Sequence, residues 1–189
     1  MIGVGGNGKQ KCTLDTFMDK EQKPFVIRKA QPTDAQSIYD LILELAIYEK
    51  EPNSVQTTPQ VIGQQLQSST PPFHCVVAQA QESVVGFALY FFNYSTWRGQ
   101  RGIYLEDLFV QEAYRKKGIA FSLMQFLAET AKKEDCGRID WSVLKWNHLA
   151  IDFYKRLGAS EMSEWVGYRL EDKEMMSILK RTKHQWYVT

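Results

Sequence analysis

Hydrophobic and polar positions along the chain follow two different periods, which separate predicted strands from predicted helices. Short runs rich in β-branched and aromatic residues predict strands over residues 24–30, 73–80, 84–94, 103–110, 138–144 and 165–170. Apolar residues at helical spacing predict a long helix after Asp34 with its apolar positions between Ile38 and Tyr48. They also predict helices over residues 121–132, 147–156 and 172–180, with a further short helix starting at Thr58-Pro59. The alternation predicts one mixed α/β domain over residues 24–189.

Polar residues mark the ends of several of these elements. Asp34 precedes the first long helical pattern and is expected to cap it, and Asn147 has the same place before the helix that Gly158 ends. The polar residues 81–83 between two strands predict a β-hairpin. Residues 1–23 contain too few apolar groups to pack, so they predict a flexible N-terminal extension.

Residues 110–120 join the strand 103–110 to the next helix through a basic turn. The first turn of a helix leaves backbone N–H groups without partners, and the helix dipole favours an anion at that end. Gly118 lets the backbone approach a phosphate closely, and Arg115, Lys116 and Lys117 add positive charge. This arrangement is typical of a phosphate site, although an isolated R-x-x-G-x-A segment is more simply a solvated connection.

Two carboxylates, Glu106 and Asp107, interrupt the apolar strand 103–110. Because neighbouring strand residues point to opposite faces, a regular strand would bury one of them. A β-bulge at this point would redirect a side chain, as often happens beside active sites. The alternative is that the strand ends here, with one carboxylate in solvent and the other capping a loop. The sequence favours neither interpretation over the other.

The helix 147–156 contains Tyr154 among the apolar residues Ile151 and Phe153. A tyrosine at helical spacing is more often part of a core than a catalyst, because its ring buries well. Tyr154 becomes a candidate catalytic residue only through the motifs that accompany it.

Composition narrows the classes of function. The 189 residues carry a formal net charge of +1 with basic and acidic residues interleaved, which argues against a nucleic-acid-binding surface. The three cysteines are far apart and lack metal-type spacing, which argues for a reducing compartment and against disulfides or a metal site. The longest apolar run is too short to span a membrane, and the first twenty residues lack the apolar segment of a signal peptide. We expect a cytoplasmic protein without a metal or membrane partner.

In shared order, these segments resemble the GNAT superfamily of acetyl-CoA-dependent N-acetyltransferases, with an acidic strand, an R-x-x-G-x-A turn and an N-x-x-A-x-x-F-Y helix followed by Gly-Ala. Several short sequence segments resemble one branch of this superfamily, the diamine acetyltransferases, which include spermidine/spermine and thialysine enzymes. They are Phe25-Val26-Ile27-Arg28, Glu44-Leu45-Ala46-x-Tyr48-Glu49, Phe73-His74-Cys75, Val85-Gly86-Phe87, Tyr94-Ser95-Thr96-Trp97, Tyr104-Leu105-Glu106-Asp107 and Phe153-Tyr154-Lys155-Arg156. The resemblance implies the GNAT fold, an α+β domain with a mixed, mostly antiparallel central sheet split at a bulge and flanked by helices.

The resemblance also implies roles for individual residues. Acetyl-CoA is expected as co-substrate, in contact with Leu108, Phe109, Val110, Arg115, Lys116, Lys117, Gly118, Ile119, Ala120, Phe121, Asn147, His148, Leu149 and Ala150. Tyr154 matches the general acid, and Glu106 matches the acidic residue that contacts the amine and helps to deprotonate it. The amine is expected to contact Tyr48, Glu49, Trp97, Glu106, Asp107, Asp140, Trp141 and Ser142. Members of this branch are homodimers with sites near the subunit boundary, so a homodimer is expected.

Departures from the family pattern bear on the substrate. Val166 stands where this branch usually has an acidic residue, and Phe121 where a small hydroxyl residue often reaches a phosphate. The segment 94–97 follows the thialysine type, and the smaller number of carboxylates favours a short diamine or lysine-like substrate over a long polyamine. Two alternatives stay open: acetylation of a protein lysine or N-terminus, and a non-catalytic acyl-CoA-binding module in which Tyr154 belongs only to the core.

Overall fold

The computed structural model describes residues 24–180, and residues 1–23 and 181–189 lie outside the described part of the chain. The predicted N-terminal extension therefore falls outside the described residues. Contacts between residues define two compact units, one that ends at residue 142 and one that begins at residue 143. The described part of the first unit contains the sheet, and that of the second is helical and extended.

The sheet is mixed and mostly antiparallel, as the sequence predicts. Its strands follow one another in chain order: β1 (Val26–Lys29), β2 (His74–Ala80), β3 (Ser83–Ser95), β4 (Gln100–Val110) and β5 (Ile139–Trp141). The pairs β1–β2, β2–β3 and β3–β4 are antiparallel, and β5 runs parallel to β4. β3 and β4 are 13 and 11 residues long, so the middle of β4 lies far from the turn that joins these two strands.

The observed strand boundaries differ from the predicted ones at the turns. Gln81 and Glu82 alone join β2 to β3, because Ala80 pairs with Ser83. The φ of 54° at Gln81 is typical of the two-residue turns that match the twist of a hairpin. A second hairpin joins β3 to β4, so β4 begins at Gln100, three residues before its predicted start. β5 is shorter than the predicted range 138–144, since only three of its residues pair with β4.

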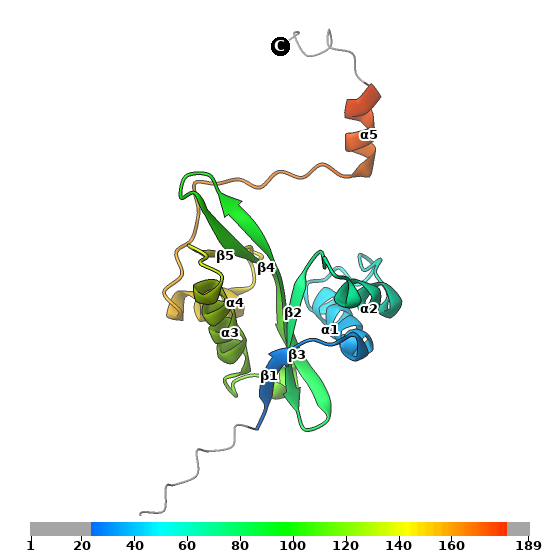
Figure 1. The fold of residues 1–189 in the computed structure, drawn as a ribbon, viewed down its shortest axis with the longest axis vertical. Helices are drawn as coiled ribbons and strands as arrows, with labels where there is room; N and C mark the ends of the chain where they lie inside the picture. Colours follow the sequence, from blue (N-terminus) through cyan, green and yellow to red (C-terminus); the bar gives the residue numbers. More distant parts are fainter. Residues whose placement is uncertain (1–23, 181–189) are drawn as a thin grey trace, which may run out of the picture. The chain divides into compact units, whose positions relative to one another are not determined.

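Helices cover both faces of the sheet. Figure 1 shows α1 (Ala35–Tyr48) and α2 (Pro59–Gln67) on one face and α3 (Ile119–Lys133) on the other. The predicted start of α2 is confirmed, because the Thr58 side chain accepts a hydrogen bond from the Val61 N–H and Pro59 takes the first helical position. Among residues 24–180, no helix combines the length and apolar character needed to cross a membrane.

The hydrophobic core lies on both sides of the sheet. On the α1–α2 side, one buried cluster joins the helices to the strands and consists of Ala35, Ile38, Leu41, Ile62, Cys75, Val77, Phe87 and Phe109. On the other side, α3 buries Ile119, Leu123 and Leu127. Each such side chain contributes about 1.5–3 kcal/mol on burial. β4 is therefore held from both faces, which makes it a rigid support for Glu106 and Asp107.

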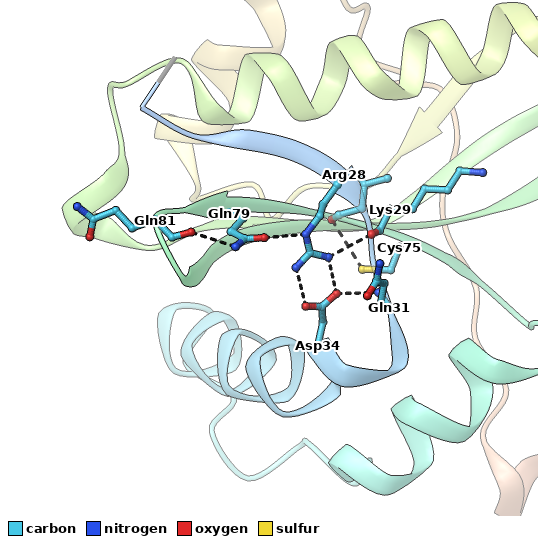
Figure 2. A network of polar contacts seen from close by, with 8 residues as sticks. Arg28, Lys29, Gln31, Asp34, Cys75, Gln79 and Gln81 are labelled. Carbon is cyan, nitrogen blue, oxygen red and sulfur yellow. Dashed lines mark hydrogen bonds and ion pairs between the residues drawn. The ribbon is translucent and has the colours of Figure 1, made fainter. Parts of the chain in front are cut away.

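Asp34 precedes α1, as predicted, but its side chain forms no cap hydrogen bond with the helix. Figure 2 shows that its two carboxylate oxygens instead accept hydrogen bonds from Arg28 Nη1 and Nη2, at 2.7 and 2.8 Å. The Gln31 N–H also donates to Asp34 Oδ2 at 2.7 Å, and Arg28 Nε donates to Gln79 Oε1 at 2.8 Å. The predicted cap is wrong, because a bidentate charged donor stabilises a carboxylate more than one backbone N–H does.

The second unit contains α4 (His148–Arg156) and α5 (Asp172–Lys180), and both helices were predicted. After α4, Gly158 has a φ of 84°, the left-handed conformation predicted for a residue that ends a helix. The strand predicted over residues 165–170 is wrong, because these residues are exposed and form no strand. A strand requires a neighbour for its backbone groups, and among residues 24–180 no strand pairs with this segment.

Candidate active site

Glu106 occupies a β-bulge in β4. Leu89 of β3 pairs with Asp107, but Tyr90 pairs with Leu105, so Glu106 has no opposite residue in the ladder. Glu106 is exposed, and Asp107 is partly buried. Because β4 continues to Val110, the predicted bulge is confirmed and the alternative of a strand end is wrong. We call Glu106 and Asp107 the carboxylate pair.

The Asp107 carboxyl lies in negative surroundings. Its burial, together with the charges of Glu106 and then Glu49, raises its pKa from 3.8 to about 6. Burial also raises the pKa of Glu49, which directly follows α1. None of the ion pairs formed by the described residues involves Asp107. The excess of negative charge favours a cationic ligand, and a carboxyl with a pKa near 6 exchanges a proton close to neutral pH.

Beyond Leu105, β4 has no strand partner among residues 24–180 on the side that faces away from β3. β5 pairs only with Ile103, Tyr104 and Leu105, and in residues 24–180 no other strand joins β4 on that side. Alternate backbone groups of residues 106–110 therefore point away from β3. We call residues 106–110 the open edge of β4, and it includes the predicted cofactor contacts Leu108, Phe109 and Val110. Such an edge pairs readily with a ligand that carries amide groups.

The basic turn, residues 111–118, has the backbone geometry of an anion site. Lys116 and Gly118 adopt left-handed conformations with φ of 61° and 82°, and Gly118 is the N-cap of α3, which has 15 residues. Turns of this kind direct backbone N–H groups toward an anion, and the helix dipole adds to the attraction. A Cβ on Gly118 would meet no atom within 4 Å, so the space in front of it is open.

The first residues of α3 differ in what they offer to a ligand. Ile119 is buried in the core, so only its backbone is available to a phosphate, and Ala120 is partly buried. Phe121 is 55% exposed, with an apolar ring where the family pattern has a hydroxyl. Phe121 offers no hydroxyl to a phosphate, so that contact falls to backbone N–H groups or to Ser122.

Two of the basic side chains in the turn have different surroundings. Arg115 Nε donates to the Val110 carbonyl oxygen at 2.9 Å, and its guanidinium carbon lies 5.1 Å from the centre of the Tyr48 ring. Lys117 Nζ lies 4.9 Å from the centre of the Tyr114 ring, within the same turn. The charge of Arg115 therefore lies against α1 and the end of β4, whereas that of Lys117 stays in the turn.

Three of the predicted amine contacts lie at β5: Asp140, Trp141 and Ser142. Asp140 pairs with Tyr104 and Trp141 with Leu105, so both flank the part of β4 that leads into the bulge. The hydroxyl oxygens of Tyr104 and Ser142 are 3.0 Å apart. The Asp140 carboxylate is already paired with Arg138 Nε at 2.7 Å, which reduces its value for binding a further cation.

Trp97 lies away from the carboxylate pair within its own chain. It occupies the turn between β3 and β4, and its side chain is 90% exposed. β4 begins at Gln100, and a strand rises about 3.3 Å per residue, so Glu106 is roughly 20 Å from that end of β4. One chain alone does not bring Trp97 and Glu106 to the same site.

Asn147 and Tyr154 belong to the second unit. Asn147 caps α4 as predicted, because its Oδ1 accepts a hydrogen bond from the Ala150 N–H at 3.2 Å. His148 and Leu149 form the first turn of α4, and both are exposed. Tyr154 lies near the end of α4 and is partly buried, which is compatible with a core role and with a catalytic role.

One contact between α1 and the basic turn has no signal in the sequence. Gln111 Nε2 donates to Glu44 Oε1 at 2.7 Å, in partly buried surroundings. Glu44 belongs to a phrase shared with the diamine acetyltransferases, but no motif pairs it with a residue 67 positions away. The folded chain alone reveals this contact.

A model of the Acetyltransferase (GNAT) family matches residues 35–159, across the bulge, the basic turn and α4. The chain is 38% identical over 164 residues to a thialysine N-epsilon-acetyltransferase of Bos taurus, which covers 81% of this chain and 96% of that protein. It is 31% identical over 164 residues to spermidine/spermine N(1)-acetyltransferase-like protein 1 of Homo sapiens, covering 82% of this chain and 24% of that protein. The solved structure of an integron cassette protein from V. cholerae matches with a TM-score of 0.71 and 27% identity, covering 84% of this chain and 99% of that chain.

Proposed function

The chain belongs to the GNAT family of acetyltransferases, and we propose that it transfers the acetyl group of acetyl-CoA to a primary amine of a small diamine, polyamine or thialysine-like substrate. The observation that carries this proposal is the bulge in β4, which presents the carboxylate pair on the strand that continues into the open edge and the basic turn. Relatives named for thialysine and spermidine/spermine support an amine as the substrate class.

The described residues fit acetyl-CoA as a co-substrate, which the family uses. The open edge of β4 offers backbone groups to the amides of the pantetheine arm. The left-handed residues Lys116 and Gly118 and the N-terminus of α3 suit the pyrophosphate, with Lys117 adding charge. On the second unit, the resemblance assigns further cofactor contacts to Asn147 through Ala150, the start of α4.

The charge of the site supports a cationic amine. Glu106 and Glu49 lie close enough to Asp107 for their negative charges, together with burial, to raise the pKa of the Asp107 carboxyl. An ammonium group bound here relieves that repulsion and gains attraction to each carboxylate. A negatively charged acceptor is disfavoured for the same reason.

The chemistry requires a base for the amine and an acid for the thiol. An alkylamine with a pKa of about 10.4 is protonated at neutral pH and cannot attack a thioester. The carboxylate pair accepts this proton through water. The nitrogen then bonds to the acetyl carbon while the carbon–sulfur bond breaks, and N–H groups of the open edge stabilise negative charge on the carbonyl oxygen. Tyr154 gives its hydroxyl proton to the departing thiolate, and the second proton that the nitrogen loses returns to the Tyr154 oxygen through water.

A homodimer is part of the proposal. The resemblance assigns Trp97 to the amine site, yet Trp97 lies at the end of β4 that is roughly 20 Å from Glu106. If Trp97 lines an amine site, that site contains the carboxylate pair of a second copy. Analytical ultracentrifugation tests the dimer, and a monomer at assay concentration that retains full activity contradicts it.

An assay of CoA thiol release tests the activity directly. We expect release from acetyl-CoA that depends on an added amine, with thialysine and short diamines better than a neutral amino acid amide. For variants that remove a carboxylate of the pair, Glu82→Gln is the matched control. It also removes one carboxylate, but from the exposed β2–β3 turn. Absence of amine-dependent release across thialysine, lysine, putrescine and spermidine contradicts the proposal.

A further inference from the structure

Two contacts join the end of α1 to the basic turn. Gln111 Nε2 donates to Glu44 Oε1 at 2.7 Å, and the Arg115 guanidinium carbon lies 5.1 Å from the centre of the Tyr48 ring. Glu44 and Tyr48 are four residues apart on α1, so they share one face of the helix. The two contacts therefore hold one face of α1 at two successive turns.

Arg115 is fixed on its other side by β4. Its Nε donates to the Val110 carbonyl oxygen at 2.9 Å, and its guanidinium carbon lies 5.7 Å from the centre of the Phe109 ring. The planar guanidinium thus has one hydrogen bond and two aromatic rings as partners, a set that an ammonium group does not reproduce. The side chain bridges α1 and the end of β4.

The position of Tyr48 determines where the chain leaves α1. α1 ends at Tyr48, and Glu49 follows it directly as the C-cap. Glu49 is close enough to Asp107 for its charge to act on that carboxyl. A side chain that fixes Tyr48 against β4 therefore also fixes the distance between Glu49 and the carboxylate pair.

We propose that Arg115 is a positioning residue of the amine site, which holds Tyr48 of α1 and the following Glu49 in register with the carboxylate pair of β4. The Gln111–Glu44 hydrogen bond is a second contact with the same effect. This inference rests on the proposed acetyl transfer for the identity of the ligand. The proposal assigns Arg115, the arginine of the R-x-x-G-x-A segment, to amine recognition. Phosphate binding is then left to the backbone of the basic turn and to Lys117.

Arg115→Lys separates the two roles, because it keeps the charge and loses the planar contacts. We expect the KM for the amine to rise about three- to tenfold, the scale of one cation–π contact. The Kd for acetyl-CoA, measured by calorimetry without amine, stays within twofold of the wild-type value. Lys117→Met is the control, and it weakens acetyl-CoA binding while the KM for the amine stays unchanged. A weaker acetyl-CoA affinity in Arg115→Lys, with an unchanged KM for the amine, overturns the proposal.

Glu44 provides a second pair of variants that leave Arg115 intact. Glu44→Leu removes the acceptor for Gln111 and is expected to raise the KM for the amine, whereas Glu44→Gln keeps an acceptor oxygen and restores it. Equal KM values in the two variants overturn the role of this contact. If Arg115 acts through Tyr48, Arg115→Lys does not raise the KM for the amine further in a protein that already carries Tyr48→Leu. Fully additive effects of the two substitutions on that KM contradict this role.

A carbon-13 NMR titration of Asp107 tests the proposal without turnover, so its failure is distinct from failure of the proposed function. If Arg115 holds Glu49 near Asp107, the pKa of Asp107 falls in Arg115→Lys, because Glu49 moves away. An unchanged Asp107 pKa overturns the positioning role, even where the wild-type protein acetylates the amine. A wild-type protein without amine-dependent thiol release contradicts the proposed function, and the titration still decides the role of Arg115.

Discussion

Asp34 and Asp107 are both withdrawn from solvent, but the charges around them have opposite signs. Asp34 is 7% exposed and bound by two guanidinium nitrogens of Arg28, which hold the pKa of its carboxyl below the usual value. Asp107 lies near Glu106 and Glu49, and burial with these charges raises its pKa to about 6. The first carboxylate joins β1 to the segment before α1, whereas the second makes folding less favourable when it is ionised.

The difference separates a carboxylate that supports the fold from one that supports chemistry. A buried charge without a cation costs free energy, so a neutral residue would serve the fold better at position 107. Groups of this kind concentrate at functional sites, where a ligand supplies the missing charge. Asp107 therefore points to a cation that residues 24–180 do not provide.

Asp107→Asn produces the largest expected effect. The value of kcat/KM for the amine falls about 10²- to 10⁴-fold, the scale of a positioned base. The melting temperature does not fall, because the variant removes a carboxylate that repels its neighbours. Steady-state kinetics and differential scanning calorimetry measure both quantities, with Glu82→Gln as the control. Wild-type kcat/KM in Asp107→Asn would show that Asp107 has no catalytic role.

Tyr154→Phe tests the other half of the proposed chemistry, the general acid. Loss of one hydroxyl lowers kcat about 10²-fold if this group protonates the departing thiolate. The KM for acetyl-CoA changes little, because the interaction forms mainly in the transition state. Single-turnover measurements establish whether chemistry limits turnover. A near-normal kcat under that condition returns Tyr154 to a core role.

Asp34→Asn is expected to have the reverse profile of Asp107→Asn. The free energy of unfolding falls by about 2 kcal/mol, less than for a fully buried pair because Arg28 remains 30% exposed. The value of kcat/KM per folded molecule stays near that of the wild type. Urea unfolding followed by tryptophan fluorescence measures the change, and Arg28→Met is the matching variant on the other partner. A large loss of kcat/KM with unchanged stability would reverse the two assignments.

The smallest expected effects are opposite dependences of stability on pH. The Asp34 carboxyl has a lowered folded pKa, so its contribution is present above its unfolded pKa of 3.8 and is lost as the pH falls through the folded value. The Asp107 carboxyl has a raised folded pKa, so its contribution is full below 3.8 and is lost as the pH rises through about 6.

Melting temperatures of the wild type, Asp34→Asn and Asp107→Asn between pH 4 and 8 measure these dependences. The stability gained by Asp107→Asn is greatest above pH 6 and disappears toward pH 4, whereas the loss in Asp34→Asn persists throughout that range. Parallel shifts of both variants with pH contradict the assignment of opposite surroundings.

Local patterns in the sequence predicted most helices and strands. The bounds of α5 match the prediction at both ends, and Thr58 caps α2 as its position before Pro59 indicated. The prediction of a strand at residues 165–170 was wrong. The residue pattern reflects only the strand propensity of the segment, whereas a strand forms only where a neighbouring strand pairs with it. The same limit explains the shorter β5, whose extent depends on its contact with β4.

The sequence predicted which residues belong to the candidate site better than it predicted the contacts that these residues form. Adjacent carboxylates in an apolar strand left a bulge and a strand end as equal alternatives, and Gly118 was expected to let the backbone approach a phosphate. The bulge at Glu106 and the left-handed φ of Gly118 come from the structure. The partner of Asp34 was not predictable, because α-helix capping and ion pairing compete for the same oxygens and only the fold brings Arg28 close. Arg115 was expected at a phosphate, but its contacts with Tyr48 and Val110 depend on the position of α1.

The pH dependence of kcat/KM for a diamine, in the wild type and in Asp107→Asn, tests the catalytic use of the carboxylate pair most directly. Deprotonation of the amine itself affects both proteins equally, so the ratio of the two profiles isolates the enzyme group. The wild-type advantage is predicted to disappear as the pH falls through about 6, where Asp107 takes up its proton. A ratio that stays constant between pH 5 and 8 would contradict the account, because Asp107 would then contribute no proton transfer.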